Sequence, residues 1–368
     1  MAGKAGGVNS YCASGDTPLE KVAIGAIVLS IKISSISDVY QDVPVLVTGV
    51  AGFIGFHTAR RLLSLGYKVF GVDNLSPYYD VQLKRDRLSQ LLPDKNFSFS
   101  EMNIADKTAM EDLWKTSGPF RRVIHLAAQA GVRYSLTNPY EYITTNCMGH
   151  LTVMEMCRHT PDFLHLVYAS SSSVYGGNQK LPFSINDAVD HPISLYAATK
   201  RSDELMSQSY SHLYDMAQTG LRFFTVYGPW GRPDMSLFIF TKSIIAGEEI
   251  QVFNHGQMKR DFTYVDDIVS GIVSSLLNPP IRENNKAPHR VLNIGNTHSE
   301  NLMDFIGIIE KSVGKKALIK YMDMQPGDVP ETFADITETT SAIGFEPTTV
   351  IAQGVPRFVS WYREYYKV

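Results

Sequence analysis

The sequence predicts an α/β protein built on a doubly wound parallel sheet, with a smaller C-terminal α/β substrate lobe. Short apolar runs alternate with segments of helical periodicity from residue 43 to about residue 170. The first run leads into closely spaced glycines and a helix, and the second run ends in an aspartate. Successive β and α units of this kind form a parallel sheet whose ligands bind at the carboxyl ends of the strands.

The first unit contains a strand, a glycine turn and a helix. Residues 45–47 are an apolar run suited to a buried strand, and residues 56–65 have helical spacing. The turn between them contains Gly49, Gly52 and Gly55. A turn without Cβ atoms lets the backbone approach a pyrophosphate, whose charge the free amides of the following helix stabilise. The unit is typical of a Rossmann-like dinucleotide site, although glycines alone are also compatible with an ordinary tight turn.

The second apolar run, residues 69–73, ends in Asp73. An acidic residue about 20 positions beyond the glycines can accept hydrogen bonds from an adenosine ribose. It also repels a 2′-phosphate, which favours NAD over NADP. The residues expected to bind this cofactor are Gly49, Gly52, Phe53, Ile54, Gly55, Asp73, Asn74, Ala127, Ala128 and Lys200.

The alternation continues along the chain. Helices are expected around 81–92, 107–116 and 139–157, and strands around 97–102, 122–128 and 163–170. Past residue 225, prolines and glycines divide the chain into shorter elements, which indicates a second lobe with a substrate role. The expected organisation is an N-terminal extension at 1–42, a dinucleotide-binding domain at 43–225 and a mainly substrate-binding lobe at 226–368, from which 263–290 returns to the first domain.

Composition excludes several classes of protein. The chain has 368 residues, 44% of them hydrophobic, and a formal net charge of −3, so neither disorder nor nucleic-acid binding is expected. The three cysteines, Cys12, Cys147 and Cys157, lack metal-ligand spacing and fit reduced thiols of a cytoplasmic protein without a metal site. Short basic pairs such as Lys84-Arg85 are expected on solvated helix faces.

The N-terminal extension contains an apolar run at residues 22–33. About 20 residues are needed to span a bilayer, and Lys32 interrupts this run, so no stable membrane span is expected. An extra strand or short helix packed on the domain is favoured over a membrane-associated segment.

The chemical centre is expected between residues 170 and 200. Tyr196 and Lys200 are four residues apart in a helix-compatible stretch, so both side chains project from one face. A lysine ammonium beside a phenol favours the phenolate, which a general base for a sugar hydroxyl requires. A lone Tyr-x-x-x-Lys is more often a surface pair on an amphipathic helix. Here the Tyr-x-x-x-Lys pair follows a strand that ends in the serine run 170–173. This run either places hydroxyls near the base or forms an ordinary serine-rich loop.

Several motifs together resemble the extended short-chain dehydrogenases that modify nucleotide sugars, the NAD-dependent epimerases and dehydratases. The motifs are TGVAGFIG (48–55), HLAAQAGVR (125–133), YASSSSVYG (168–176), LYAATK (195–200), LRFFTVYGPWGRPDM (221–235) and RDFTYVDDIV (260–269). They are most similar to those of UDP-glucuronate 4-epimerases, and the resemblance runs from about residue 43 to the C-terminus.

This resemblance implies roles for individual residues. Tyr196 is the catalytic base, Lys200 promotes its ionisation and binds the cofactor ribose, and Ser171 hydrogen-bonds the sugar O4. The residues implied in substrate binding are Ser172, Ser173, Thr225, Arg232, Arg260 and Asp328. Arg232 and Thr225 resemble residues that hold the substrate carboxylate. A contact to the diphosphate or a turn-stabilising surface role remains open for Arg232.

The implied reaction inverts C4 of a UDP-uronic acid through transient oxidation to a 4-keto sugar, with NAD tightly bound and regenerated in each cycle. The serine run carries no acidic residue, which favours epimerisation over dehydration or decarboxylation. Alternatives are a 4-epimerase of neutral or N-acetylated UDP-hexoses, a UDP-glucuronate decarboxylase and a non-catalytic NAD-binding protein. The family also implies a homodimer that forms through two helices, one of which contains Tyr196.

Overall fold

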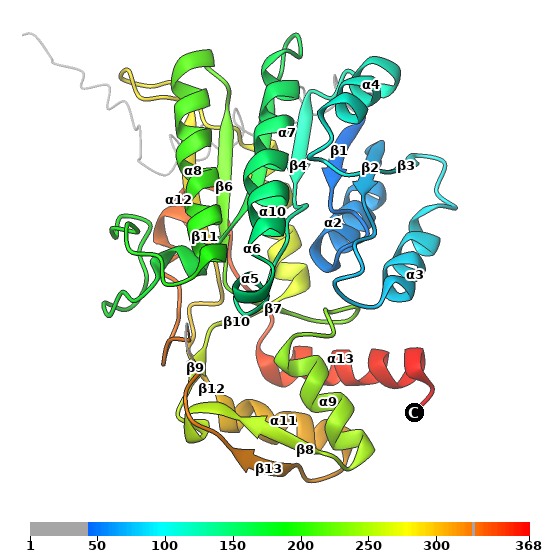
Figure 1. Ribbon diagram of the computed structural model, residues 1–368, viewed down its shortest axis with the longest axis vertical. Coiled ribbons are helices and arrows are strands. Elements are labelled where there is room, and N and C mark those ends of the chain that lie inside the picture. Colours follow the sequence, from blue (N-terminus) through cyan, green and yellow to red (C-terminus); the bar gives the residue numbers. More distant parts are fainter. Residues whose placement is uncertain (1–42, 326–327) are drawn as a thin grey trace, which may run out of the picture. The chain divides into compact units, whose positions relative to one another are not determined.

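The computed structural model describes residues 43–325 and 328–368. A seven-stranded sheet lies at its centre in the order β11-β6-β5-β4-β1-β2-β3, and every neighbouring pair is parallel (Figure 1). The strands are β1 (Val45–Thr48), β2 (Val69–Asp73), β3 (Phe97–Glu101), β4 (Arg122–His125), β5 (His165–Ser171), β6 (Gln218–Phe223) and β11 (His289–Ile294). The doubly wound parallel sheet that the sequence predicts is therefore confirmed.

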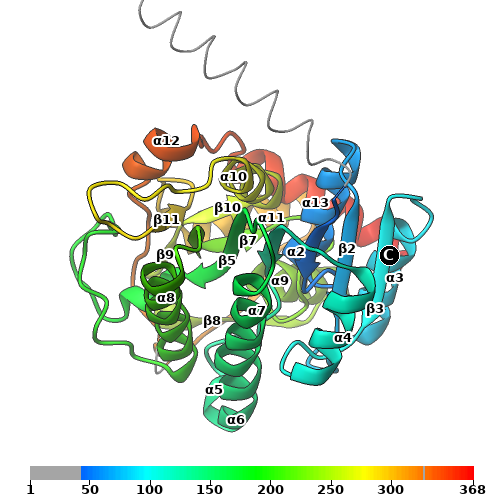
Figure 2. The same cartoon turned by 90° about the horizontal axis from the view of Figure 1, so that it is seen from above.

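Helices cover both faces of this sheet. Successive residues of a strand point to opposite faces, so in β1 Val45 and Val47 belong to one core cluster and Leu46 to the other. The first cluster includes residues of α2 (Phe53–Ser64), α3 (Val81–Leu91) and α10 (Val265–Leu277). The second includes residues of α4 (Lys107–Ser117), α7 (Gly149–Arg158) and α8 (Leu195–Tyr214). Figure 2 shows α4, α7 and α8 on one side of the sheet and α10 on the other.

Most expected elements occur within one or two residues of their predicted bounds, and three differ more. Helix α2 begins at Phe53, three residues before the expected start, so Gly55 lies inside the helix. Strand β4 ends at His125, three residues earlier than expected. The helix expected at 139–157 is divided into α6 (Pro139–Tyr142), the π-helical segment η1 (Ile143–Met148) and α7. A short helix, α5 (Tyr134–Thr137), precedes it.

Beyond residue 225 the chain forms short strands and helices. The strands pair as β7 (Thr225–Tyr227) with β10 (Phe262–Tyr264), β9 (Lys259–Arg260) with β12 (Glu300–Asn301), and β8 (Glu249–Val252) with β13 (Leu318–Tyr321). The helices are α9 (Ser236–Ala246), α11 (Leu302–Val313), α12 (Thr337–Ile343) and α13 (Ile351–Tyr366), and α11 packs against α9 and α13.

Two elements of this region belong to the layers of the large sheet. Helix α10 packs on α2, and β11 pairs with β6 at the edge of the sheet. The division into domains at residue 225 stays a prediction. The N-terminal extension at 1–42, with its apolar run and Cys12, lies outside the described residues. Within the described ranges, no helix is both long and apolar enough to cross a membrane.

Candidate active site

The glycine turn between β1 and α2 leaves no room for side chains at Gly49 and Gly55. Gly49 has φ +72°, and a Cβ there would lie 2.7 Å from the backbone nitrogen of Ala127. A Cβ on Gly55 would lie 2.0 Å from the carbonyl oxygen of Gly49. No side chain caps the N-terminus of α2 at Gly52, so the amides of the first helical turn remain available to an anion.

Asp73 is the last residue of β2 and lies beside this turn. It is 7% exposed, and its carboxylate accepts hydrogen bonds from the amides of Ala51 (3.0 Å) and Leu75 (2.9 Å). Burial raises the pKa of Asp73, and the positive charge of Lys84 opposes this effect. An ionised carboxylate has about four acceptor positions. Two amides leave capacity for the hydroxyls of a ribose.

A single cavity, called here the cofactor cavity, joins this turn to the end of β5 and the start of α8. It is lined by all residues predicted to bind the cofactor and by the predicted catalytic group: Gly49, Gly52, Phe53, Ile54, Gly55, Asp73, Asn74, Ala127, Ala128, Ser171, Tyr196 and Lys200. A backbone cradle that excludes Cβ atoms, an uncapped helix N-terminus and a buried carboxylate are the groups that a dinucleotide needs. The residues present therefore fit NAD.

The end of β5 and the first turn of α8 position the predicted catalytic residues. The hydroxyl of Ser171, the last residue of β5, accepts a hydrogen bond from the amide of Ser173 (3.1 Å). Ser194 caps α8 by accepting from the amide of Ala197 (3.1 Å), which begins the helix just before Tyr196. Lys200 is 3% exposed, and its ammonium donates to the carbonyl oxygen of Ala169 (3.0 Å) and to Oδ2 of Asp203 (3.1 Å).

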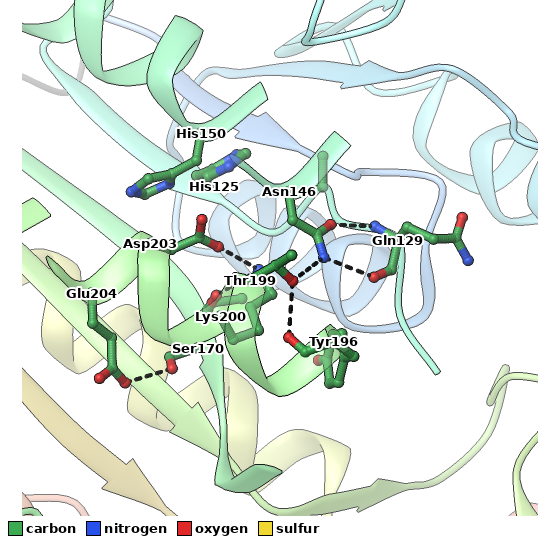
Figure 3. Close-up of polar contacts among 12 residues, drawn as sticks. His125, Gln129, Asn146, His150, Ser170, Tyr196, Thr199, Lys200, Asp203 and Glu204 are labelled. Carbon is green, nitrogen blue, oxygen red and sulfur yellow. Dashed lines mark hydrogen bonds and ion pairs between the residues drawn. The ribbon is translucent and has the colours of Figure 1, made fainter. Parts of the chain in front are cut away.

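A network of buried polar groups fixes this end of α8 (Figure 3). The side-chain nitrogen of Asn146, on η1, donates to the hydroxyl of Thr199 (3.0 Å) and to the carbonyl oxygen of Gln129 (3.1 Å). The hydroxyl of Thr199 in turn donates to the carbonyl oxygen of Tyr196 (2.8 Å). The segment after β4, the π-helical turn and the backbone of Tyr196 are thereby connected.

Most residues predicted to bind the substrate line a second cavity. It contains Ser172, Ser173, Thr225, Arg260 and Asp328. Arg260 donates to the backbone carbonyl oxygens of Lys259 and Pro330, and burial lowers its pKa. Asp328 lies 3.5 Å from the guanidinium of Arg133, which is a partner that the sequence did not indicate.

Arg232 is separated from this group and lines the cofactor cavity instead. Its guanidinium forms a two-point contact with Asp234, with Nε 3.0 Å from Oδ1 and a terminal nitrogen 2.5 Å from Oδ2. Tyr78, which also lines the cavity, donates to the same carboxylate (3.0 Å). Although burial opposes it, the charge of Asp234 raises the pKa of Arg232. The carboxylate-binding fork expected of Arg232 is therefore already in contact with a carboxylate of this chain.

Two residues of α3 belong to the site although the sequence did not point to them. The expectation of a solvated face for Lys84 was wrong: it is 6% exposed and lines the cofactor cavity, 4.6 Å from the ring centre of Tyr79. Arg87 is fully buried and donates to the carbonyl oxygens of Ala51 (2.8 Å) and Trp230 (2.6 Å). It thus connects the glycine turn to the segment before Arg232. The helical spacing of Leu83, Lys84 and Arg87 is the sequence signal that these two cations share the inner face of α3.

Comparison with known proteins is consistent with this geometry. The sequence profile of the NAD dependent epimerase/dehydratase family matches residues 45–295. A probable UDP-glucuronate 4-epimerase of Rhizobium meliloti is 45% identical over 334 residues, which cover 88% of this chain and 97% of the relative.

Solved structures of similar proteins include two that differ in substrate. One is a UDP-glucuronic acid 4-epimerase from Bacillus cereus in complex with UDP-glucuronic acid and NAD, with a TM-score of 0.80, 31% identity and coverage of 88% of this chain and all of that one. The other is a UDP-glucose 4-epimerase with UDP-glucose from Thermotoga maritima, with a TM-score of 0.78, 30% identity and coverage of 88% and 99%.

Proposed function

Because this chain belongs to the NAD dependent epimerase/dehydratase family, we propose that it interconverts UDP-glucuronate and UDP-galacturonate by inverting C4 of the sugar. The observation that carries this proposal is the shared cavity, in which the glycine turn and Asp73 lie in one space with Ser171, Tyr196 and Lys200. A dinucleotide and a sugar hydroxyl can meet only where both sets of residues are within reach.

Tyr196 acts as the general base in this proposal. It removes the proton from the C4 hydroxyl, and Ser171, at the end of the neighbouring strand, hydrogen-bonds the same oxygen. The ammonium of Lys200 lies one helical turn away and stabilises the phenolate that Tyr196 must provide. Bound NAD accepts the hydrogen of C4 with its electron pair and returns it within the same cycle, so no net oxidation occurs.

Inversion requires the 4-keto sugar to present its other face before C4 is reduced again. The nucleotide must be held firmly while the sugar turns. We assign the nucleotide and diphosphate to the second cavity, where Arg260 supplies a positive charge and Asp328 an acceptor for hydroxyls. Ser172, Ser173 and Thr225 line the same cavity and are assigned to the sugar, which must pass between this cavity and Tyr196.

The uronate raises a chemical problem of its own. A uronic acid oxidised at C4 is a β-keto acid, which loses CO₂ when its carboxylate bond aligns with the carbonyl π system. An epimerase must hold the carboxylate out of this alignment. Thr225 with Arg232 is assigned this task, for which the guanidinium of Arg232 has to exchange Asp234 for the substrate carboxylate. The Rhizobium relative supports the uronate as substrate. The fold does not discriminate, because the two solved structures match almost equally well.

The assay that tests this function uses the purified protein without added NAD. UDP-glucuronate, UDP-glucose and UDP-N-acetylglucosamine are supplied separately, and the products are identified. We expect UDP-galacturonate from the first and little turnover of the other two. Rapid turnover of UDP-glucose alone would make the protein a neutral-hexose epimerase, and CO₂ release would make it a decarboxylase. Bound NAD without any turnover would indicate a non-catalytic NAD-binding protein.

A homodimer in the cytoplasm completes the proposal. Large apolar side chains are exposed on neighbouring helices from α5 to α8, which supports a helical interface between two copies: Leu136, Tyr140, Ile143, Met148, Leu205 and Leu213. Sedimentation velocity tests the dimer, and Leu205→Glu should shift it toward the monomer. The cytoplasm is proposed because its pool supplies both NAD and UDP-sugars. Cell fractionation tests this location.

A further inference from the structure

Helix α8 carries a buried acid one turn beyond Lys200. Asp203 is 1% exposed, and its Oδ2 lies 3.1 Å from the ammonium of Lys200. Tyr196, Lys200 and Asp203 follow one another at spacings of four and three residues, so they share one face of the helix. Figure 3 shows Asp203 and Tyr196 on opposite sides of Lys200. Asp203 does not line either cavity, so it reaches the reaction only through Lys200.

A purely structural role does not account for this acid well. Its second oxygen, Oδ1, is buried and has no hydrogen-bond partner among the described residues. Buried ion pairs contribute little net stability, because desolvation of the two charges offsets their attraction. A neutral side chain of similar volume would fill the same space. The distinctive effect of Asp203 is therefore electrostatic.

The ammonium of Lys200 lies between two groups that respond to its charge. It stabilises the phenolate of Tyr196 on one side, while Asp203 partly neutralises it on the other. Burial alone would lower the pKa of Lys200, but the charges of Asp203 and Tyr196 raise it overall. Asp203 thus keeps Lys200 protonated and at the same time weakens its effect on Tyr196.

We propose that Asp203 is a positioning residue that sets the working pH range of the Tyr196–Lys200 pair by fixing the ammonium of Lys200 and partly neutralising it. The inference rests on the proposed role of Tyr196 as the base of the epimerisation.

Other titratable groups around Lys200 and Asp203 come from several elements. None of them replaces Asp203 as the anion in contact with the ammonium of Lys200. They are Tyr196 and Glu204 on α8, Cys147 on η1, His150 on α7, His125 on β4 and Tyr168 on β5. Burial lowers the pKa of His125 to about 3 and that of His150 well below its usual value, so both are neutral near pH 7. Burial also raises the pKa of Cys147 and of Tyr168, which keeps them neutral. Glu204 is paired with Arg222 at 2.8 Å and 2.9 Å.

The test is Asp203→Asn, which keeps the shape of the side chain and removes its charge. We expect both limbs of the bell-shaped kcat profile to move to lower pH by about one unit, the lower end of the shift that a charge within about 4–6 Å produces. The acid limb moves because the unneutralised ammonium stabilises the phenolate more strongly. The alkaline limb moves because Lys200 without its anion loses its proton more easily.

A matched control is Asp215→Asn, at the C-terminal cap of the same helix. Asp215 is exposed and has φ 55°, a left-handed conformation that asparagine tolerates well. Its profile should match that of the parent protein. Asp203→Ser provides a second neutral variant if the amide variant fails to fold.

A second readout does not depend on turnover. Phenolate absorbance that disappears with Tyr196→Phe reports Tyr196. This signal should appear at lower pH in Asp203→Asn than in the parent protein, whether or not the protein epimerises sugars. A shifted signal without epimerase activity would confirm the effect of Asp203 on the Tyr196–Lys200 pair and reject the proposed function.

Three results would overturn the inference: unchanged limbs with unchanged rates, a uniform loss of rate at every pH, or a phenolate signal that does not move. The second of these is the result that a merely structural role predicts.

Discussion

Tyr196 and Lys200 are one helical turn apart at the start of α8, and the proposed reaction depends on this spacing. The phenol of Tyr196 must reach the sugar while Lys200 stays buried behind it. The cap at Ser194 and the contacts of Thr199 hold this turn in place. At the scale of single residues, proton transfer therefore depends on the hydroxyl of Tyr196, which the first turn of α8 holds in place.

The first prediction concerns that hydroxyl. Tyr196→Phe should lower kcat by about 10²–10⁴-fold, the range attributed to general acid–base catalysis, and leave the bound NAD in place. The matched control is Tyr214→Phe, the same change at the last residue of α8, which is 45% exposed. Full activity in Tyr196→Phe would reject the mechanism.

The second prediction concerns Arg232. If Arg232 binds the sugar carboxylate, Arg232→Gln removes a hydrogen bond to a charged group, worth about 1.5–3 kcal/mol. The kcat/KM for UDP-glucuronate should fall about 10- to 100-fold, and CO₂ release should rise. Any slow turnover of UDP-glucose should stay unchanged. The control is Arg61→Gln, because Arg61 is exposed on α2. Equal losses on both sugars would mean that Arg232 contacts the diphosphate or that, through Asp234, it stabilises its own segment of the chain.

Sequence reasoning at this scale identified residue types and missed their partners. Tyr196 and Lys200 were predicted from their spacing, but Asp203 and Asp234 were not, although each lies within three residues of a predicted site residue. The reason is that an acid beside a base in the sequence is as compatible with a solvated surface pair as with a buried one. Lys84 was misplaced for the same reason, because the sequence alone does not show that the inner face of α3 meets a cavity.

At the scale of elements, the turn before α2 has to bring its backbone against the cofactor. Gly55→Ala would place a Cβ 2.0 Å from the carbonyl oxygen of Gly49, so the turn must move. A displacement of about 1 Å can cost about 10²-fold in rate, and the NAD content of the purified protein should fall with it. Acid extraction of the protein measures this content.

The control for this change is Gly307→Ala, within α11. A Cβ at Gly307 meets no atom within 4 Å. Alanine should therefore stabilise the helix by about 0.5–1 kcal/mol and leave the NAD content unchanged. Normal NAD content in Gly55→Ala would contradict the role given to this turn.

Periodicity predicted the positions of elements better than their internal geometry. The helix expected at 139–157 is present in extent, but residues 143–148 are π-helical. In this segment Asn146 meets Gln129 and Thr199, and an extra residue in the turn changes which side chains face α8. Hydrophobic spacing does not encode such an insertion, because the apolar residues on both sides still fit a helix.

At the scale of the whole molecule, burial of uncharged histidines should make stability depend on pH. Among the described residues, burial lowers the pKa of His57, His125 and His165 to about 3 and that of His289 to about 4, and it lowers that of His150 as well. The unfolded chain binds these protons near pH 6.5 and the folded chain does not. The free energy of unfolding should therefore fall below about pH 6.5, by about 1.4 kcal/mol per pH unit for each histidine.

Acids with a raised pKa act in the opposite direction. Burial raises the pKa of Asp73, and it raises that of Asp203 and Asp261 to about 6, so the folded chain binds these protons first as the pH falls. They are fewer than the histidines, and the net slope stays positive. Urea unfolding from neutral pH down to about pH 5 measures this slope of the free energy of unfolding against pH. His57→Gln should reduce the slope, whereas His255→Gln, at an exposed site, should not. A flat profile would contradict the assignment of neutral buried histidines.

The sequence also predicted how distant segments meet. The glycine turn, the serine run and the residues before β7 follow β1, β5 and β6, and parallel strands bring their carboxyl ends to one edge of the sheet. The return of β11 to this sheet was less readable, because nothing in a strand's own sequence names its neighbour. The separation of Arg232 from the second cavity and its contact with Asp234 could not be predicted either, since the sequence does not show where the side chain of Arg232 lies.

The central claim is that the hydrogen of C4 leaves the sugar and returns to its opposite face within one site. Its most direct test is UDP-glucuronate labelled with deuterium at C4, incubated with the purified protein without added NAD. We expect UDP-galacturonate that retains the deuterium at C4. Product in which solvent hydrogen has replaced the deuterium, or no UDP-galacturonate at all, would contradict the account.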